Sequence, residues 1–502
     1  MPSLNRTPNE KELEKLVSIY LRAETAIINE IGRLRSQGLV DYHAVAALER
    51  VQAILRQMES DCWEYVPKMI EKQFYVRVPE ARKALEVPET AAKHAAGYAN
   101  AAVLTGEQHA IVDRLAANLM GEITDASMTV MATLQSALIG RVEPDVYRRV
   151  GLEQVAAQQA AGRGVNASVP SFVQALRREG VRAFTDKAGR DWSLHTYCTM
   201  VSRTTSRQAE VLAVLTADSE HDLYMISSHG TTCALCAPYE GRVYSRSGTD
   251  PDFPPLAAAF GKVDPAGPDT LANTWLNIHP NCLHVLLPWT AAGRTDGEIQ
   301  KIKDFSNPRK NPFSRDPRSE SQIAAYRKKE RARAQWLADY RQWERYRVTL
   351  GDRVPGRFET FLHQKREDGE RYRLWRLDYR RRAELLEHPE RALPGADKAS
   401  AADAKFTGYF FNPENPKGLA KGRAFSSHLG YNVENWQIMR DEILEAAKMY
   451  PVTYRSSSIY GKLYSQLVIL QGVNNKPANV LLGWIVKPDG STWLTTAHME
   501  EF

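Results

Sequence analysis

The sequence contains little cysteine, five residues in a chain of 502. So few thiols in so long a chain argue against a disulfide framework and are typical of a reducing compartment. Apolar runs long enough to cross a bilayer are also missing, so neither a membrane span nor a membrane partner is expected. Residues 1–15 have no apolar core and no cleavage site, and we therefore expect no signal peptide.

A strong excess of one charge is lacking as well. The chain has 66 Lys and Arg against 60 Asp and Glu, a formal net charge of +6. The whole chain is therefore not expected to be a strong polyanion binder, and local charge matters more. Its apolar content of 43% is that of a globular protein, and its length is too great for a single core. We therefore expect a multidomain fold.

Changes in composition divide the chain into five parts, which differ in periodicity, turn residues and charge. We expect a mainly helical region over 1–220, a loop-rich α+β region with Cys and His over 221–300, a basic helical segment over 301–392, a small polar linker over 393–404, and a small α+β domain over 405–502.

Hydrophobic periodicity predicts the helices of the first region. The capping box at 7–10 (TPNE) starts one helix, and Gly38 ends it. A second helix begins near Asp41, and further amphipathic runs cover 107–139 and 169–180. We interpret the apolar stripes as core packing. The first stripe consists of Leu13, Leu16, Tyr20, Ile27, Ile31 and Leu34.

The segment 301–390 has a local excess of basic residues, 24 Lys and Arg against 15 Asp and Glu. Aromatic residues recur in it at helical spacing, and 351–356 (GDRVPG) predicts a break between two helices. The favoured interpretation is an aromatic core under a solvated basic face. The alternative is a contact with packaged DNA or with an acidic partner surface. The aromatic residues are Trp336, Tyr340 and Trp343, then Tyr372, Trp375 and Tyr379.

The last hundred residues are expected to form two helices and a three-stranded antiparallel sheet. The first helix covers about 417–428, and Asn432 caps the second. The strands are predicted at 462–470, 478–487 and 491–498, with a hairpin turn at Asp489-Gly490.

Three of the five cysteines lie in one short region that also holds two histidines. Cys233 and Cys236 form a CxxC pair, and residues 279–284 (HPNCLH) follow about forty residues later. Thiolate and imidazole are the ligands that Zn²⁺ prefers in tetrahedral structural sites. The expected ligands are Cys233, Cys236 and Cys282, with His279 or His284 as the fourth and His229 in reserve. The alternative is three reduced, buried cysteines without a metal, and a catalytic zinc is disfavoured.

Several motifs resemble, in order, those of bacteriophage minor capsid proteins of the second type, which are related in role to the Mu F-like head morphogenesis proteins. They are 191–197 (DWSLHTY), 203–207 (RTTSR), 226–230 (ISSHG), 239–245 (YEGRVYS), 279–284 (HPNCLH) and 352–355 (DRVP). This resemblance covers about 10–385. It implies a virion protein of the capsid interior or portal vertex, made in the bacterial host cytoplasm. The implied partners are portal, major capsid or scaffold proteins.

Residues 405–498 resemble a second group, the barnase, EndoU, colicin E5/D and RelE-like nucleases, through 409–418 (YFFNPENPKG), 423–425 (RAF) and Trp436. The resemblance implies metal-independent cleavage of RNA. That chemistry needs a base, an acid and a cation for the phosphate. Lys417, Lys421 and His428 share one helix face. We expect Lys421 to stabilise the phosphate, His428 to act as general acid or base, Thr495 to position the phosphate, and Lys417 to support it.

Thr496 and His498 on the last strand are further candidates, and Tyr464 and Trp484 are candidates for stacking a base. The alternative for this domain is a binding module without turnover.

Three functions follow from these patterns. The first is a minor capsid protein with a toxin-like tail, and the second is a nuclease effector that the virion delivers. The third is a zinc-containing DNA-binding protein of the packaging machinery. The order of the motifs between 191 and 284 favours the first. The mixed charge over 1–220 disfavours the third, because duplex binding normally needs a concentrated basic patch.

Overall fold

The computed structural model describes residues 8–36, 41–85, 104–139, 182–185 and 191–500. The chain forms two compact units that divide within helix α10 (Glu320–Leu350). The first unit comprises 1–26, 48–134 and 181–337, and the second comprises 27–47, 135–180 and 338–502. The helical run predicted at 169–180 lies outside the described residues, as does Thr7. Among the described helices, none is both long and apolar enough to span a bilayer.

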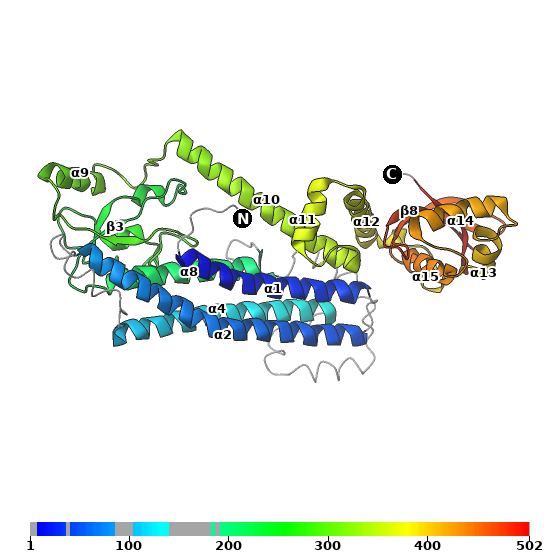
Figure 1. Cartoon of the computed structure of the whole chain (residues 1–502), viewed down its shortest axis with the longest axis horizontal. Coiled ribbons are helices and arrows are strands. Elements are labelled where there is room, and N and C mark those ends of the chain that lie inside the picture. Colours follow the sequence, from blue (N-terminus) through cyan, green and yellow to red (C-terminus); the bar gives the residue numbers. More distant parts are fainter. Residues whose placement is uncertain (1–7, 37–40, 86–103, 140–181, 186–190, 501–502) are drawn as a thin grey trace. The chain divides into compact units, whose positions relative to one another are not determined.

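Long helices dominate the first unit, which contains most of α1 (Pro8–Ser36), α2 (Asp41–Leu85) and α4 (Gly106–Ile139) and all of α8 (Leu194–Leu215). The predicted helix starts near 8 and 41 and the predicted run at 107–139 are confirmed. Figure 1 shows these helices running alongside one another. Buried polar contacts join α8 to two of them, from Ser202 to Tyr20 on α1 at 2.8 Å and from Ser206 to Gln73 on α2 at 2.8 Å. A short ladder of β1 (Arg182–Thr185) and β2 (Asp191–Ser193), which the periodicity did not predict, precedes α8.

The central region is built on a small antiparallel sheet in the order β4-β3-β5. Its strands are β3 (Leu223–Ile226), β4 (Val243–Ser245) and β5 (Leu286–Pro288). Helix α9 (Asp296–Ser306) follows β5 and starts with a capping box between Thr295 and Glu298. Between β4 and β5 the chain has only short 3₁₀ turns at Leu256–Ala259 and Leu271–Asn273, as expected for a loop-rich region.

In the last segment of the second unit, the C-terminal half of α10 is followed by a 3₁₀ turn (Gly351–Arg353), α11 (Phe358–Glu367) and α12 (Glu370–Glu387). The predicted break at 351–356 is therefore present. The aromatic residues pack within the protein. Trp343 and Trp375 are 0% and 1% exposed, and Tyr346 stacks on Tyr379 with ring centroids 4.5 Å apart. Core packing, the favoured interpretation, accounts for this stripe.

The C-terminal domain has four strands rather than the predicted three. Their order is β6-β7-β8-β9, all antiparallel. The strands are β6 (Val452–Ser458), β7 (Gly461–Leu470), β8 (Ala478–Val486) and β9 (Thr492–Met499). The missed strand β6 lies at the edge, and most of its side chains are exposed. An edge strand that faces water on both sides lacks the apolar alternation by which strands are predicted.

Helices α14 (Pro416–Leu429) and α15 (Trp436–Ala447) are the two predicted helices of this domain, and they pack on the sheet (Figure 1). The N-cap of α15 is Asn435 and not Asn432, as was expected. A one-turn helix α13 (Asp403–Lys405) and a π-helix η8 (Phe406–Phe410) precede these helices. Phe410, Phe425 and Trp484 are each 0% exposed in the shared core.

Residues 393–404, which we expected to be a linker, are attached to the sheet. Ser400 forms a parallel bridge with Trp493, through Ser400 N–H to Thr492 O at 2.9 Å and Leu494 N–H to Ser400 O at 2.9 Å. The hydroxyl of Thr492 also donates to Pro394 O at 2.6 Å. The segment also contains a 3₁₀ turn (Ala396–Lys398), so a small, polar composition here belongs to a segment attached to the sheet and not to a free linker.

Candidate functional sites

The two halves of the Cys/His set meet because of the order of the central sheet. Ile226, the last residue of β3, pairs with Leu286, the first residue of β5. The loop after β3 and the loop before β5 therefore leave the sheet at the same end. The first loop carries Cys233 and Cys236, and the second carries His279, Cys282 and His284. All five predicted ligands are thus brought together.

The distances within this Cys/His centre are short. His279 Nε2 lies 3.1 Å from Cys233 Sγ and 3.0 Å from Cys236 Sγ. Cys236 Sγ lies 3.8 Å from Cys282 Sγ, and Cys282 Sγ lies 3.3 Å from His284 Nδ1. Two triads result, one of Cys233, Cys236 and His279 and one of Cys236, Cys282 and His284. Cys236 belongs to both.

Each histidine keeps one ring nitrogen toward sulfur and hydrogen-bonds with the other. His279 Nδ1 lies 2.6 Å from Pro280 O, and His284 Nε2 lies 2.5 Å from Glu240 Oε1. Metal-binding histidines are typically oriented in this way by a carbonyl or a carboxylate. Glu240 lies in the 239–245 motif, but residue spacing alone does not predict its contact with His284.

The electrostatics favour a cation among these side chains. The hydrogen bond from Cys236 lowers the pKa of Cys233 to about 3, and the same neighbour lowers the pKa of Cys282 to about 4. The pKa of Cys236 is raised, because it lies between those two thiolates. Burial opposes a charged His284, but Cys282 and Glu240 raise its pKa to about 9. A bound cation would compensate the clustered negative sulfurs.

The donor set fits zinc. Zn–S bonds of about 2.3 Å in a tetrahedron place two sulfurs about 3.8 Å apart, which is the separation of Cys236 Sγ and Cys282 Sγ, 3.8 Å. Cys236 and Cys282 are 2% and 3% exposed, whereas Cys233 and His279 are half-buried. His229, the reserve ligand, is exposed. Its ring lies edge-on to His284 with centroids 4.7 Å apart, and its Nε2 lies 3.1 Å from Ser227 Oγ.

A polar pocket of about 320 Å³ adjoins this centre, and His229 and Glu240 line it together with Ser228 and Arg318. The Arg318 guanidinium is bound to Asp316 at 2.7 Å and to Thr232 O at 3.1 Å. It therefore braces the loop that precedes the CxxC pair.

In the C-terminal domain, two of the predicted residues lie together at strand β9. Lys421 Nζ on α14 donates to Thr496 Oγ1 at 3.1 Å. The neighbouring Thr495 is the extra residue of a β-bulge, since Gly483 pairs with Thr496 and Trp484 with Leu494. Its carbonyl accepts from Lys405 Nζ at 2.6 Å. Lys405 was missed, because nothing in its local sequence links it to β9.

The other predicted residues of this domain lie elsewhere. His428 is exposed, and its ring contacts Ser427 Oγ at 3.0 Å and Ala424 O at 3.2 Å. It follows Lys421 by seven residues, about 10 Å along the helix axis. Lys417 is exposed at the start of α14.

Neither candidate for base stacking is well placed. Trp484 is 0% exposed, and its indole N–H donates to Gln466 Oε1 at 2.9 Å, so it belongs to the core and not to a stacking surface. Tyr464 is half-buried against Tyr454.

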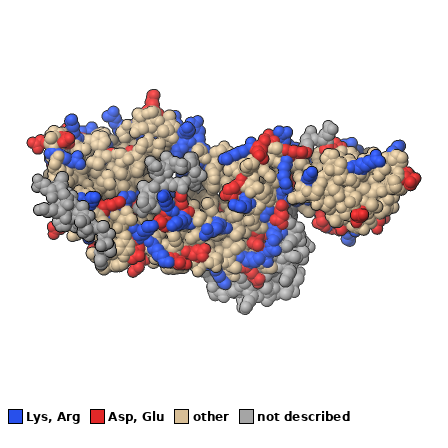
Figure 2. Space-filling view, in the orientation of Figure 1, with Lys and Arg blue, Asp and Glu red and all other residues tan. Residues whose placement is uncertain are grey.

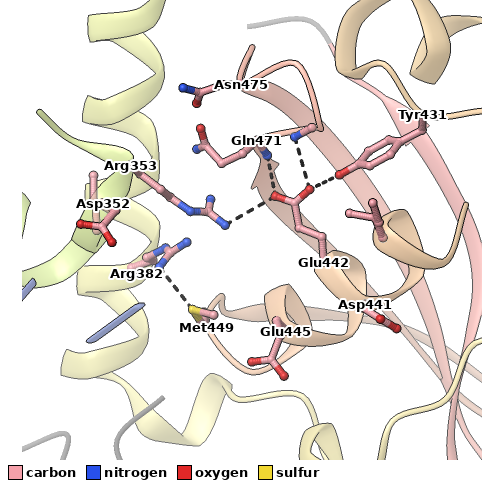
Figure 3. A pocket seen from close by; sticks show the side chains of 13 residues that line it. Asp352, Arg353, Arg382, Tyr431, Asp441, Glu442, Glu445, Met449, Gln471 and Asn475 are labelled. Carbon is pink, nitrogen blue, oxygen red and sulfur yellow. Dashed lines mark hydrogen bonds and ion pairs between the residues drawn. The ribbon is translucent and has the colours of Figure 1, made fainter. Parts of the chain in front are cut away.

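A larger pocket of about 610 Å³ lies between the 351–382 segment and the C-terminal domain, within the second unit (Figure 3). Glu442 lies at its wall and accepts hydrogen bonds from Gln471 N–H at 2.6 Å and from the Tyr431 hydroxyl. Arg353 approaches Glu442 at 3.7 Å. Other charged groups of the lining pair with residues outside it, as Asp441 does with Arg440 and Glu445 with Lys448.

Behind this pocket, Asp378 on α12 is the centre of a buried ionic network. Its carboxylate accepts from the Tyr450 hydroxyl at 2.7 Å, from Arg382 Nε at 2.8 Å and from Arg353 at 3.3 Å. Arg353 also donates to Ile469 O on β7 at 2.6 Å. The network ties the helices of the second unit to the sheet.

A comparison with protein families decides the affiliation of the larger part. Residues 6–343, well over half of the chain, match the family described as Phage minor capsid protein 2. The chain belongs to the phage minor capsid protein 2 family. This membership supports a role in the phage capsid or head and a location in the virion. The matched range ends at 343, before the 352–355 motif, whereas the resemblance was expected to reach about 385.

The C-terminal part is a separate module of the minor capsid protein. Residues 392–501 match a domain of unknown function, DUF6883. The description of this domain family names no activity. Comparison with curated proteins and with solved structures gave no match.

Proposed function

We propose that this minor capsid protein acts at the portal vertex, in few copies, and contacts portal, major capsid or scaffold proteins through its helical bundle. The observation that carries the proposal is the family match, which covers the whole described bundle. The bundle also exposes large apolar side chains. Trp63 and Tyr75 on α2 are 54% and 42% exposed, and Met128 on α4 is 48% exposed. Such side chains are suited to burial in an interface.

Mass spectrometry of purified particles tests this proposal. We expect the chain in particles, at a copy number far below that of the shell protein. Trp63→Ser and Met128→Ser together should reduce its incorporation while the shell still assembles. A matched control replaces the exposed Leu287 of the central sheet with Ser. Normal incorporation of the double variant would contradict a bundle-mediated contact, and absence of the wild-type chain from particles would contradict the location.

We further propose that the Cys/His centre holds one structural Zn²⁺ through Cys233, Cys236, Cys282 and His279. His279 is chosen because its Nε2 contacts two of the sulfurs, whereas His284 Nδ1 contacts one. His284 would then not bind the metal, but would contact the Cys282 sulfur through Nδ1 while Glu240 orients its ring through Nε2. Four protein ligands leave no open position, so the ion would clip the two loops together rather than catalyse a reaction.

Metal analysis of the full-length protein should find about one zinc per chain. Cys236→Ser should abolish binding, and His279→Ala should reduce it far more than His284→Ala. Chelation of the wild type should make the 246–278 loop sensitive to protease. Zinc content that is unaffected by Cys236→Ser would exclude this site.

A second candidate function is metal-independent RNA cleavage by the C-terminal domain. Its support is the position of Lys421 beside Thr496 and the bulge at Thr495, since β-bulges are over-represented near active sites. Lys421 would stabilise the charge that develops on the phosphate. His428 is kept as the proposed acid or base and Lys417 as a supporting cation; because His428 lies about 10 Å from Lys421 along α14, this assignment requires a substrate that extends along the helix.

The full-length protein should degrade total RNA or tRNA in the presence of chelator. Lys421→Ala should slow this by about 30- to 1,000-fold, as expected for about 2–4 kcal/mol of lost stabilisation. His428→Ala tests the separate assignment of the imidazole. If folded wild-type protein leaves RNA intact across pH 5–8, the ribonuclease proposal is wrong and the domain is a binding module.

A further inference from the structure

We infer that Lys405 and Lys421 form a single binding site for a phosphate group at the bulge of strand β9. The two lysines come from different elements, α13 and α14, and reach consecutive residues of one strand. Lys405 Nζ donates to Thr495 O at 2.6 Å, and Lys421 Nζ donates to Thr496 Oγ1 at 3.1 Å. The bulge makes this possible, because Thr495 has no partner on β8 and its carbonyl is available to a side chain.

The tight packing of α14 holds Lys421 in place. A Cβ atom on Gly418 would lie 2.0 Å from Tyr409 O, and one on Gly422 would lie 1.8 Å from Phe410 O. Glycine at these two positions therefore lets the helix approach the backbone of the π-helix η8. Lys405 immediately precedes η8 and lies 5.6 Å from the ring centroid of Tyr409. π-helical turns are rare and frequently occur at functional sites.

The two ammonium groups are close enough to repel one another. The pKa of Lys405 is lowered by burial and by the charge of Lys421. Among the residues that the structure describes, neither lysine forms an ion pair with a carboxylate. Both lysines donate instead to neutral acceptors, the Thr495 carbonyl and the Thr496 hydroxyl. Each ammonium has three donors and uses one, so donors remain for a ligand. An anion with several acceptor oxygens would relieve the repulsion and use these donors.

A tetrahedral phosphate group matches two converging ammonium groups better than a planar carboxylate does, because it offers oxygens in several directions. The phosphate can come from a single RNA strand or from free phosphate. If the phosphate belongs to an RNA strand, the inference rests on the proposed ribonuclease function. The inference then adds Lys405 to the proposed ribonuclease site. It concerns RNA binding, which can be measured without cleavage.

The test uses the full-length protein and a fluorescein-labelled single-stranded RNA in chelator, with binding followed by anisotropy. Lys405→Ala and Lys421→Ala should each weaken binding by about tenfold. The fold-loss of RNA affinity in the double variant should be smaller than the product of the two single fold-losses, since both lysines bind one phosphate group. Lys398→Ala and Lys476→Ala, two exposed lysines of the same domain, are the matched controls. Lys405→Met keeps the aliphatic stem if Lys405→Ala proves unstable by circular dichroism.

Competition distinguishes the two sources. Displacement of RNA by millimolar inorganic phosphate identifies a site for one phosphate group, and its failure identifies a site that needs the strand. Both results support the inference if they depend on both lysines. RNA binding that neither substitution changes, or that the controls weaken equally, overturns it. If binding depends on both lysines but the wild type cleaves no RNA, the binding site stands and the ribonuclease function falls.

Discussion

At the scale of single residues, Asp378 is the buried charge on which the second unit most depends. It is 1% exposed, and it binds Arg382, itself 4% exposed, at 2.8 Å. Asp378→Ala would leave that guanidinium buried without its carboxylate. We expect the free energy of unfolding to fall by about 3–5 kcal/mol. Urea unfolding measures this, with the exposed Asp397→Ala as the control. A loss no larger than the control's would contradict the role of the network.

Glu12 on α1 makes the bundle of the first unit sensitive to acid. The hydrogen bond from Lys72 on α2, with a second from Tyr65, lowers the pKa of Glu12 to about 2 from an ordinary value of 4.5. A carboxylate with a lowered folded-state pKa stabilises the fold fully above about pH 4.5, and this contribution disappears as the pH falls toward 2. Because Lys72 is half exposed, we expect a contribution of about 1 kcal/mol.

The comparison of Glu12→Gln with wild type tests this assignment. The variant should unfold at lower urea concentration at pH 6, and the difference should shrink between pH 4.5 and pH 3. Glu64→Gln on α2, whose carboxylate and Lys68 partner are both exposed, is the control. A difference that does not vary with pH would show that packing, and not the charge, is responsible.

At the scale of elements, helix α10 has two unlike halves. Its C-terminal half is buried through Tyr340, Trp343 and Tyr346, whereas the basic residues of its N-terminal half are exposed. Figure 2 shows Lys and Arg interspersed with Asp and Glu on the face in view. Any DNA contact of the basic segment should therefore lie in the N-terminal half of α10, as Lys and Arg there remain open to phosphates. These residues are Arg327, Lys328, Lys329, Arg331 and Arg333.

Replacing Arg327, Lys328 and Arg331 with Gln should weaken DNA binding by about tenfold or more at low salt. It should also make the slope of log K against log salt shallower by about three, since about 0.9 counterion is released per phosphate contact. The exposed Arg373, Arg376 and Arg380 of α12 provide the matched triple control. Binding that ignores salt, or that only the control weakens, would argue against this surface. Electrophoretic shifts at several salt concentrations give the measurement.

Helices were predictable from the sequence where apolar spacing was regular, as in α1, α2, α4 and α14. Strand β6 was not, because its VTYRSSS sequence offers little apolar alternation at an exposed edge. The Cys/His centre was predictable because ligand chemistry is encoded in residue type and spacing. The contacts of Glu240 with His284 and of Lys405 with Thr495 depend on which segments the sheets bring together in space. Sequence spacing does not predict such contacts.

At the scale of the molecule, the domain matched at 392–501 relies on residues that precede it. Arg353, Asp378 and Arg382 contact Tyr450 and Ile469 within it. A fragment 338–502 should therefore melt about 10 °C or more above a fragment 392–502, since about 2 kcal/mol in a domain of this size shifts the midpoint by that amount. Thermal unfolding by circular dichroism measures the difference. Equal midpoints would show that the domain is self-sufficient.

The same network bears on where a different domain could be joined to this chain. A recombination junction at 392 would bring in a foreign domain without Tyr450 or the Ile469 carbonyl, leaving Arg353, Arg382 and Asp378 facing an unmatched surface. A junction upstream of Arg353 would transfer both halves of the network together. Viable chimaeras should therefore be joined before the 3₁₀ turn at Gly351–Arg353. The segment that must be exchanged is then longer than the domain matched at 392–501.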